Sequence, residues 1–169
     1  EITLRSVRAD HVDLLIEKLG RTGLRISPDS DGLWAMASGR PRPIDVATLP
    51  YPGLATDYLP LLVALLAYSG GTSYATENVF SGRFRYVGEL ARMGAHIRVD
   101  GHHMVIDGVQ RLSGAPVKAV DIRAGAALVV AGLGADGETV ISDAHHIDRG
   151  YERFVERMRS VGADIEQLD

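Results

Sequence analysis

"DYLPLLVALLAYSGGTSYATENVF", residues 57–80, places an apolar run before two glycines and an alternating stretch. The run is apolar nearly all round, which indicates a buried helix rather than a surface helix. The glycines are typical of a helix end, and the alternation after them predicts a β-strand. Residues 125–147, "GAALVVAGLGADGETVISDAHHI", repeat the same order. The sequence therefore predicts two buried helices, each followed by a strand.

Amphipathic helices form a second repeated pattern. Three segments have apolar residues at three- and four-residue spacing, then a glycine, then an alternating stretch: residues 14–27 "LLIEKLGRTGLRIS", 87–100 "VGELARMGAHIRVD" and 154–168 "FVERMRSVGADIEQL". Each segment predicts an amphipathic helix that stops at the glycine and leads into a strand. The glycines recur about every 70 residues, a period that indicates repeated subdomains rather than a solenoid.

Short strands before the buried helices complete the repeating unit. "PIDVATL" (43–49) precedes the first buried helix and "PVKAVDIR" (116–123) precedes the second. The unit is strand, buried helix, strand, amphipathic helix, strand, strand, abbreviated βαβαββ. This order predicts an α+β fold with the buried helices inside and the sheets outside. We expect residues 1–169 to form a single domain that contains about two full units plus parts of others.

Composition limits the classes of protein to which the chain can belong. Its 169 residues, 46% of them hydrophobic, suffice for one globular core. No apolar run approaches the roughly 20 residues of a membrane-spanning helix and no stretch resembles a signal peptide, so we expect no membrane partner. The absence of cysteine excludes disulfides and thiolate zinc sites within the chain and agrees with a cytoplasmic location. A formal charge of −4 argues against a nucleic-acid partner.

Charged residues mark the expected junctions between strands and helices. Asp57 stands at the start of one buried helix, Arg123 just before the other, and Arg149 at the start of the third amphipathic helix. Arg83 lies in the first turn of the second amphipathic helix, where a cation opposes the helix dipole. The three arginines and Asp57 together indicate a site for a small anion. The alternatives are a simple N-cap for Asp57 and solvated surface positions for the arginines.

Three other patterns do not predict a cofactor or a metal site. "GLGADG" (132–137) matches a dinucleotide-binding pattern but closes a helix and opens a strand, the reverse of the required context. The pairs His102–His103 and His145–His146 lie in expected strands, where neighbours point to opposite faces, so one pair is poorly placed to bind one metal ion. "DSDG" (29–32) lacks the glutamate of a calcium loop and predicts a turn. We therefore expect no metal and no cofactor.

Three longer motifs resemble a known family. "TENVFSGRFRYVGELARMGAH" (76–96), "DIRAGAALVVAGL" (121–133) and "HIDRGYERF" (146–154) are similar, in this order, to motifs of the enolpyruvyl transferases. The similarity runs from "EITLR" at the start of the chain to "GADIEQL" near its end. It points to the branch of the family that acts on UDP-N-acetylglucosamine. The sister enzyme of the shikimate pathway shares the fold but is not similar at these motifs.

The resemblance implies both an architecture and a reaction. Members of the family have two globular domains, each of three βαβαββ units arranged as an inside-out α/β barrel, and the chain resembles most of the C-terminal-side domain. They move the enolpyruvyl group of phosphoenolpyruvate to the 3-hydroxyl of UDP-N-acetylglucosamine by addition and elimination. This transferase step is the first committed step of peptidoglycan synthesis, and so serves cell-wall biogenesis, cell shape and cell division. The implied partners are the two substrates and the N-terminal domain of the same enzyme.

The resemblance also implies which residues contact the UDP-sugar. The carboxylate of Asp57 is implied to contact the sugar hydroxyl and to act as its base. A carboxylate is a weak base for an alcohol, so proton removal has to accompany C–O bond formation. On the uridine side, the implied contacts are the backbone of Val79 and the side chain of Phe80.

A second group of residues is implied to bind phosphoenolpyruvate. Arg83, Arg123 and Arg149 match arginines that ring its carboxylate and phosphate, and Asp121 matches an aspartate of the same substrate site. Cations aimed at charge that shifts during a reaction lower its barrier. Catalytic roles are therefore expected for Arg123 and Arg149, together with Asp57.

The chain departs from the family pattern at two positions and lacks part of the site. Ala55 stands where the family usually has proline, and Leu59 stands where it usually has glutamine, which affects the expected polar contacts around the sugar. The family's lysine–asparagine pair and its loop with the general acid belong to the other domain. We therefore expect the isolated chain to be inactive. The alternatives are a non-catalytic binding or regulatory module that retains the fold, and a divergent paralogue with another acceptor.

Overall fold

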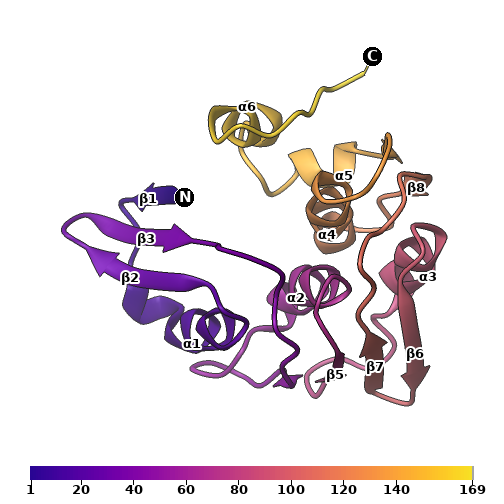
Figure 1. The fold of residues 1–169 in the computed structure, drawn as a ribbon, viewed down its shortest axis with the longest axis horizontal. Helices are drawn as coiled ribbons and strands as arrows, with labels where there is room; N and C mark the ends of the chain where they lie inside the picture. The colour runs from indigo at the N-terminus through magenta and orange to yellow at the C-terminus, as the bar shows by residue number, and fades with distance from the viewer. Residues whose placement is uncertain (169) are drawn as a thin grey trace.

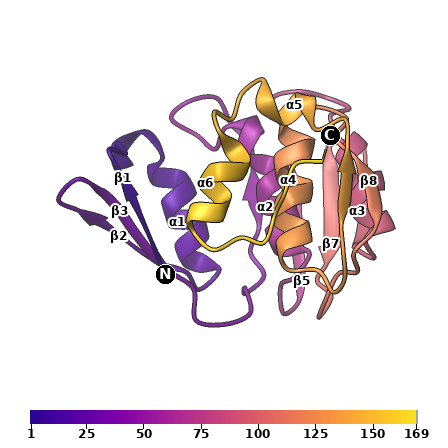
Figure 2. The ribbon, with the colours of Figure 1, turned by 90° about the horizontal axis from the view of Figure 1, so that it is seen from above.

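The computed structural model describes residues 1–168 of the chain. Two helices lie at its centre, with a three-stranded sheet on one side and a four-stranded sheet on the other (Figures 1 and 2). The strands are β1 (Ile2–Arg5), β2 (Arg25–Asp29), β3 (Gly32–Met36), β4 (Val46–Ala47), β5 (Thr72–Thr76), β6 (His96–Asp100), β7 (His103–Asp107), β8 (Pro116–Lys118) and β9 (Val140–Ser142). The helices are η1 (Ala9–His11), α1 (Asp13–Arg21), η2 (Thr56–Tyr58), α2 (Leu59–Leu66), α3 (Arg85–Arg92), α4 (Ile122–Leu133), α5 (His145–Asp148) and α6 (Phe154–Ser160).

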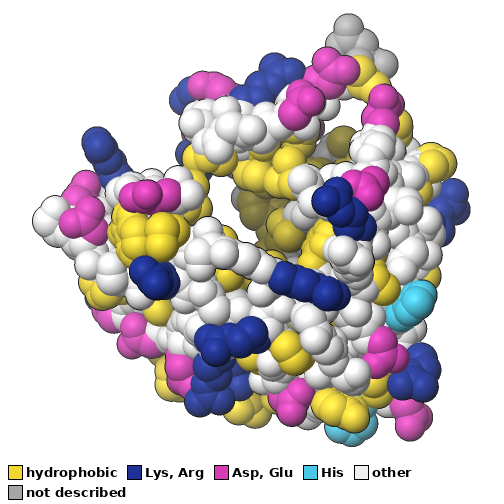
Figure 3. All heavy atoms as spheres, viewed as in Figure 1, with side chains coloured by type: hydrophobic (Ala, Val, Ile, Leu, Met, Phe, Trp, Pro, Cys, Tyr) yellow, Lys and Arg dark blue, Asp and Glu magenta, His cyan; other side chains and the backbone are white. Residues whose placement is uncertain are grey.

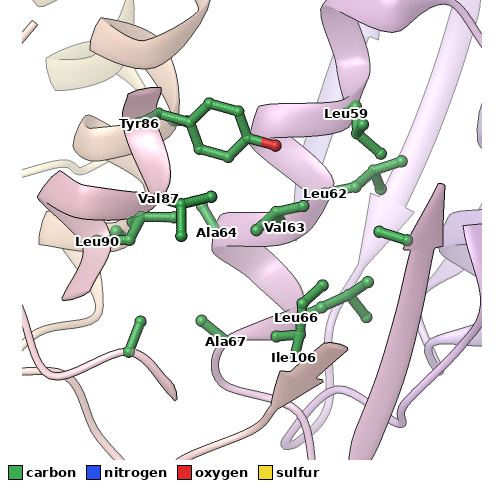
Figure 4. Packing of buried hydrophobic residues seen from close by; sticks show 14 of the residues in the cluster. Leu59, Leu62, Val63, Ala64, Leu66, Ala67, Tyr86, Val87, Leu90 and Ile106 are labelled. Carbon is green, nitrogen blue, oxygen red and sulfur yellow. The ribbon is translucent and has the colours of Figure 1, made fainter. Parts of the chain in front are cut away.

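Helices α2 and α4 form the buried centre of this fold and pack against each other (Figure 2). The side chains of Leu62 and Leu66 on α2 are 2% and 0% exposed. Figure 4 shows α2 between Tyr86 and Leu90 of α3 and Ile106 of β7. Each large apolar side chain removed from water contributes about 1.5–3 kcal/mol, so helices that are apolar all round are stable only in such a position. The prediction of two buried helices is confirmed.

The four-stranded sheet has the strand order β4-β5-β7-β6. Strands β4 and β5 are parallel, whereas β7 is antiparallel to both β5 and β6. From Val46 to Asp107 the elements follow the order β4, α2, β5, α3, β6, β7, which is the predicted repeating unit. The other strands form an antiparallel sheet β1-β3-β2 and a parallel pair β8-β9. The mixture of helices and mainly antiparallel sheets makes the fold α+β.

Three glycines end the amphipathic helices, as predicted. Gly23, Gly94 and Gly162 follow α1, α3 and α6, and their φ angles are 105°, 88° and 93°. These values lie in the left-handed region, where a side chain is strained and glycine is not. The first two glycines lead into β2 and β6, so the order of helix, glycine and strand holds for these two repeats.

Two predictions of local structure near the C-terminus are wrong. Residues 164–168 form no strand, because no other described strand pairs with them and a lone strand lacks hydrogen-bond partners. The pair His145–His146 lies in helix α5 rather than at the end of a strand. Asp143, with a φ of 57°, ends the extended segment before the histidines. Arg149 is consequently the C-cap of α5, and the amphipathic helix α6 begins only at Phe154.

The surface is hollowed beneath α6. Figure 3 shows hydrophobic side chains inside a hollow on this face, with charged side chains around it. The groove beneath α6 is lined by residues of α4, β9 and α6 and by residues 164–168. Its lining includes Leu133, Val140 and Phe154. In residues 1–168 no helix is both long and apolar enough to cross a bilayer.

Candidate functional site

The N-termini of the two buried helices carry the central charged residues of the candidate site. The turn η2 leads into α2 and contains Asp57, while Asp121 is the N-cap of α4 and Arg123 lies in its first turn. Because α2 and α4 pack together, these ends approach each other. Nε of Arg123 lies 3.8 Å from Oδ1 of Asp57. The structure thus brings together two of the three expected catalytic residues.

Arg123 carries a positive charge at a position that disfavours positive charge. Its side chain is only 10% exposed, and the N-terminal end of a helix disfavours positive charge. Two carboxylates compensate: Oδ2 of Asp121 lies 3.2 Å from Nη2, and Asp57 approaches Nε. A buried charge requires such partners, because its hydration is lost. The guanidinium is therefore held in one place, with a carboxylate on either side.

Asp121 combines helix capping with the anchoring of Arg123. Its Oδ1 accepts hydrogen bonds of 2.9 Å from the backbone N–H groups of Arg123 and Ala124. Partial burial alone would raise the pKa of the Asp121 carboxyl. The two backbone N–H groups and the Arg123 charge outweigh this effect, so the pKa lies below its usual value. Asp121 therefore remains ionised and keeps Arg123 in place at neutral pH.

Asp57 is not a helix cap in this structure. The cap positions of η2 and α2 are Ala55 and Tyr58, and neither makes a side-chain capping hydrogen bond. The Asp57 side chain is 70% exposed and its approach to Arg123 is loose. An exposed carboxylate next to a fixed cation can accept a proton or bind a hydroxyl group. The N-cap interpretation of Asp57 is therefore wrong.

Arg149 follows helix α5, and its side chain has no anchoring partner among the described hydrogen bonds and ion pairs. It is exposed, and the following residue, Gly150, lies against the side chain of Ile122 in the first turn of α4. A second close approach joins Gly125 of α4 to Ile147 of α5. The two glycines therefore place the segment that carries Arg149 at the end of α4 where Arg123 lies.

The loop after β5 carries the other expected contacts. The guanidinium carbon of Arg83 lies 3.8 Å from the centre of the Phe80 ring, a cation–π contact. Phe80 is 44% exposed and Val79 is half-buried. Arg83 precedes α3 rather than lying in its first turn, because this helix begins at Arg85. No described ion pair joins Arg83 to the group formed by Asp57, Asp121 and Arg123.

Sequence reasoning missed Glu77, which lies between these two groups of residues. It is 3% exposed and accepts hydrogen bonds from Thr48, Thr56 and the loop after β5. Burial alone would raise the pKa of the Glu77 carboxyl. The hydrogen bonds from these donors have the opposite and larger effect, so the pKa lies below the usual glutamate value. A signal was present: Ser73, Ala75 and Glu77 share the buried face of an alternating strand, where a charged residue is unexpected.

The two departures from the family pattern have different surroundings. Leu59 is 1% exposed and belongs to the hydrophobic core, so its side chain does not face an open site. Ala55 is exposed and lies directly before η2. The substitution at position 59 is thus accommodated by packing, whereas the one at position 55 affects the loop that precedes Asp57.

The histidine pairs have no metal-binding surroundings in the described part of the chain. The rings of His102 and His103 are 3.9 Å apart, and those of His145 and His146 are 4.2 Å apart. Residues 1–168 contain no group of three or more histidine, cysteine, aspartate or glutamate side chains arranged to hold a metal ion. Both pairs are packed neighbours on their own segments.

Comparison with known proteins gives the class to which this fold and site belong. The family model described as EPSP synthase (3-phosphoshikimate 1-carboxyvinyltransferase) matches residues 1–158. The chain belongs to this family of enolpyruvyl transferases. The solved enolpyruvyl transferase NikO from Streptomyces tendae superposes with a TM-score of 0.83 at 31% identity, over 92% of this chain and 36% of NikO. The EPSP synthase from Acinetobacter baumannii, with a TM-score of 0.71 at 20% identity over 96% of this chain and 38% of its own, shares the fold.

Similar curated proteins carry a more particular name. UDP-N-acetylglucosamine 1-carboxyvinyltransferase from Nocardia farcinica is 48% identical over 99% of the chain, and the protein of that name from Mycobacterium leprae is 47% identical over 99%. The protein named UDP-N-acetylglucosamine 1-carboxyvinyltransferase 2 from Carboxydothermus hydrogenoformans is 49% identical over 99%. The chain spans 39%, 40% and 41% of the lengths of these three relatives. It therefore matches them along its whole length but corresponds to less than half of each.

Proposed function

We propose that this chain forms most of the C-terminal-side domain of an enolpyruvyl transferase that uses phosphoenolpyruvate and UDP-N-acetylglucosamine. The observation that carries the proposal is the buried guanidinium of Arg123, held between Asp57 and Asp121 at the N-terminus of α4. A fixed cation beside an exposed carboxylate suits a reaction in which one group binds an anionic substrate and the other removes a proton. The names of relatives that are 46–49% identical support the same reaction.

The proposed chemistry has two steps. In the addition, Asp57 accepts the proton of the 3-hydroxyl while the sugar oxygen bonds to C2 of phosphoenolpyruvate, and C3 receives a proton from an acid outside this chain. In the elimination, the tetrahedral phosphoketal loses phosphate from C2 and a proton from C3, which restores the double bond. Arg123, Arg149 and Arg83 bind the carboxylate and phosphate and stabilise the charge that moves onto the leaving phosphate. No step requires a cofactor.

The UDP-sugar is proposed to bind on the other side of Asp57. Its uridine lies against the loop after β5, where Phe80 offers an exposed aromatic face and Val79 a backbone contact. The sugar hydroxyl then reaches Asp57 in η2. Since phosphoenolpyruvate and nucleotide sugars are cytoplasmic metabolites, the proposed location is the cytoplasm and the proposed pathway is peptidoglycan synthesis.

The chain is proposed to be completed by other parts of the same protein. Elements β4 to β7 make one whole unit, whereas α1-β2-β3 and β8-α4-β9-α6 are incomplete ones. Completion of these units would close an inside-out α/β barrel and fill the groove beneath α6. The remaining domain would supply the opposite wall of the active site and the general acid.

Phosphate release tests this proposal. The full-length protein that contains this chain should release phosphate from phosphoenolpyruvate in the presence of UDP-N-acetylglucosamine, and residues 1–169 alone should not. Release by the chain alone at the rate of the full-length protein would contradict the proposed division of the active site. Release with 3-phosphoshikimate instead would indicate the divergent paralogue. Binding without any release by the full-length protein would indicate the non-catalytic module.

A further inference from the structure

Glu77 is a buried carboxylate at a position where a half-buried strand usually places an apolar residue. It follows β5 directly and is 3% exposed. Burying a carboxylate is strongly unfavourable unless hydrogen bonds replace its lost hydration. An apolar residue of the same size would fill the space without this cost, so the acceptor oxygens of Glu77 are the feature that needs an explanation.

The hydrogen bonds of Glu77 join the loop that follows it to two segments that lie more than 20 residues earlier in the chain. Its Oε1 accepts from Oγ1 of Thr48 at 2.7 Å and from the N–H groups of Val79 at 2.8 Å and Phe80 at 3.1 Å. Its Oε2 accepts from Oγ1 of Thr56 at 2.5 Å. One carboxylate thus connects the end of β4, the start of η2 and the loop after β5.

Two hydrogen bonds between Asn78 and Thr48 strengthen the connection. Oγ1 of Thr48, which is 0% exposed, accepts from the N–H of Asn78 at 2.9 Å. The side-chain amide of Asn78 also donates to the carbonyl oxygen of Thr48 at 3.2 Å. Three consecutive N–H groups, those of residues 78, 79 and 80, are therefore fixed by Glu77 and its partner Thr48. The loop is tied at each of these residues rather than at one point.

We propose that Glu77 is a positioning residue that sets the distance between the two ends of the UDP-sugar site. One of its oxygens holds Thr56, the neighbour of Asp57, and the other holds the backbone of Val79 and Phe80. These segments are the ones assigned to the sugar hydroxyl and to the uridine, so the inference rests on the proposed function. Glu77 itself touches neither substrate and acts through the segments that it holds.

Kinetics of the full-length protein with Glu77→Met provide the first test. Methionine is similar in size and accepts none of the four hydrogen bonds, so the KM for the UDP-sugar should rise roughly tenfold or more and kcat should fall by a similar factor. The KM for phosphoenolpyruvate should change less than about twofold, because Arg123 is held by Asp121 instead. A purely structural role would reduce the amount of folded protein and leave both KM values unchanged, which would overturn the proposal.

Glu77→Gln distinguishes acceptor geometry from charge. The amide oxygen can accept the three bonds of Oε1, and the amide nitrogen can donate to the hydroxyl of Thr56. The kcat and the KM for the UDP-sugar should therefore stay within about threefold of the values of the unaltered protein. Equal losses in the glutamine and methionine variants would contradict positioning by hydrogen bonds. The matched control is Glu89→Met on α3, whose carboxylate accepts a 2.9 Å bond from the N–H of Lys118 and should leave the UDP-sugar KM unchanged.

Two further measurements keep the test decisive if Glu77→Met fails to fold. Thr56→Val removes the hydroxyl that holds η2 and should lower kcat more than it raises the KM for the UDP-sugar; the opposite order would overturn the proposal. Amide hydrogen exchange should become at least about tenfold faster at Val79 and Phe80 in Glu77→Met than in Glu89→Met, or at Asn78 in Thr48→Val if the methionine variant does not fold. Unchanged exchange would also overturn it. If the unaltered protein neither binds UDP-N-acetylglucosamine nor releases phosphate, the proposed function fails, and the exchange measurement still decides whether Glu77 holds the loop.

Discussion

The close approach of α5 to α4 leads to a sharp prediction for Gly125→Ala. A Cβ at position 125 would lie 2.5 Å from Cγ1 of Ile147 and 3.2 Å from Cβ of Ala119. Ile147 is 5% exposed and Ala119 is 0% exposed, so both side chains are buried against α4 and have to shift to admit the new methyl group. The substitution therefore adds a methyl group where the neighbouring atoms are closer than normal contact distance.

The magnitude follows from two opposing contributions. Overpacking a well-packed interior costs about 1–3 kcal/mol. Alanine is favoured over glycine inside a helix by about 1 kcal/mol. We therefore expect Gly125→Ala to lower the free energy of unfolding by between about 0 and 2 kcal/mol.

Gly88→Ala is the matched control for this prediction. Gly88 lies inside α3, and a Cβ there would meet no atom within 4 Å. The propensity gain should then appear alone, so this variant should be more stable than the unaltered protein by about 1 kcal/mol. The two variants should differ by about 1–3 kcal/mol.

Urea unfolding followed by circular dichroism measures this difference in one protein background. In the double variant Gly125→Ala with Ile147→Ala, the cost of the second change should be smaller than its cost alone, because the added methyl occupies part of the space left by Ile147. Because Arg149 directly follows α5, the Gly125→Ala variant should also weaken the binding of phosphoenolpyruvate more than the binding of the UDP-sugar. A Gly125→Ala protein as stable as Gly88→Ala would refute the close packing of α5 on α4.

Two further predictions concern the carboxylates beside Arg123. Asp57→Asn in the full-length protein should reduce turnover far more than UDP-sugar binding, because an amide keeps the shape of the carboxylate but is not a base. Phosphate release measures the turnover and calorimetry measures the binding. Unchanged turnover would show that Asp57 takes no part in proton transfer. Asp121→Asn should lower stability at neutral pH by less than about 1 kcal/mol, because the carboxylate is 38% exposed and partly screened. Since folding lowers the pKa of Asp121, the stabilisation by its carboxylate is present above about pH 4 and is lost as the pH falls through the folded-state pKa. The free energies of unfolding of the unaltered protein and of Asp121→Asn should therefore converge in acid. A difference in urea midpoint that does not change with pH would contradict this.

Local patterns predicted the secondary structure well where a neighbouring element supports it. The buried helices, the glycine stops and the strands after Gly23 and Gly94 follow from periodicity and from the conformational freedom of glycine. The strand expected after Gly162 fails because alternation alone does not supply hydrogen-bond partners. The prediction that Arg149 starts the amphipathic helix was also wrong. A short helix, α5, lies between the strand and the amphipathic helix, and Arg149 ends it.

The sequence by itself determined the repeated order of elements and marked Asp57 and Arg123 as charged residues at helix starts, because periodicity and helix-end preferences act over a few residues. Only the tertiary structure decided that Arg123 lies between Asp57 and Asp121, since that contact requires α2 and α4 to pack side by side. It also decided the role of Glu77, whose partners Thr48 and Thr56 approach it only when β4, η2 and β5 come together. The physical reason is the same in both cases. A buried charge is stable only when distant segments supply its partners, and their distances depend on how the core packs.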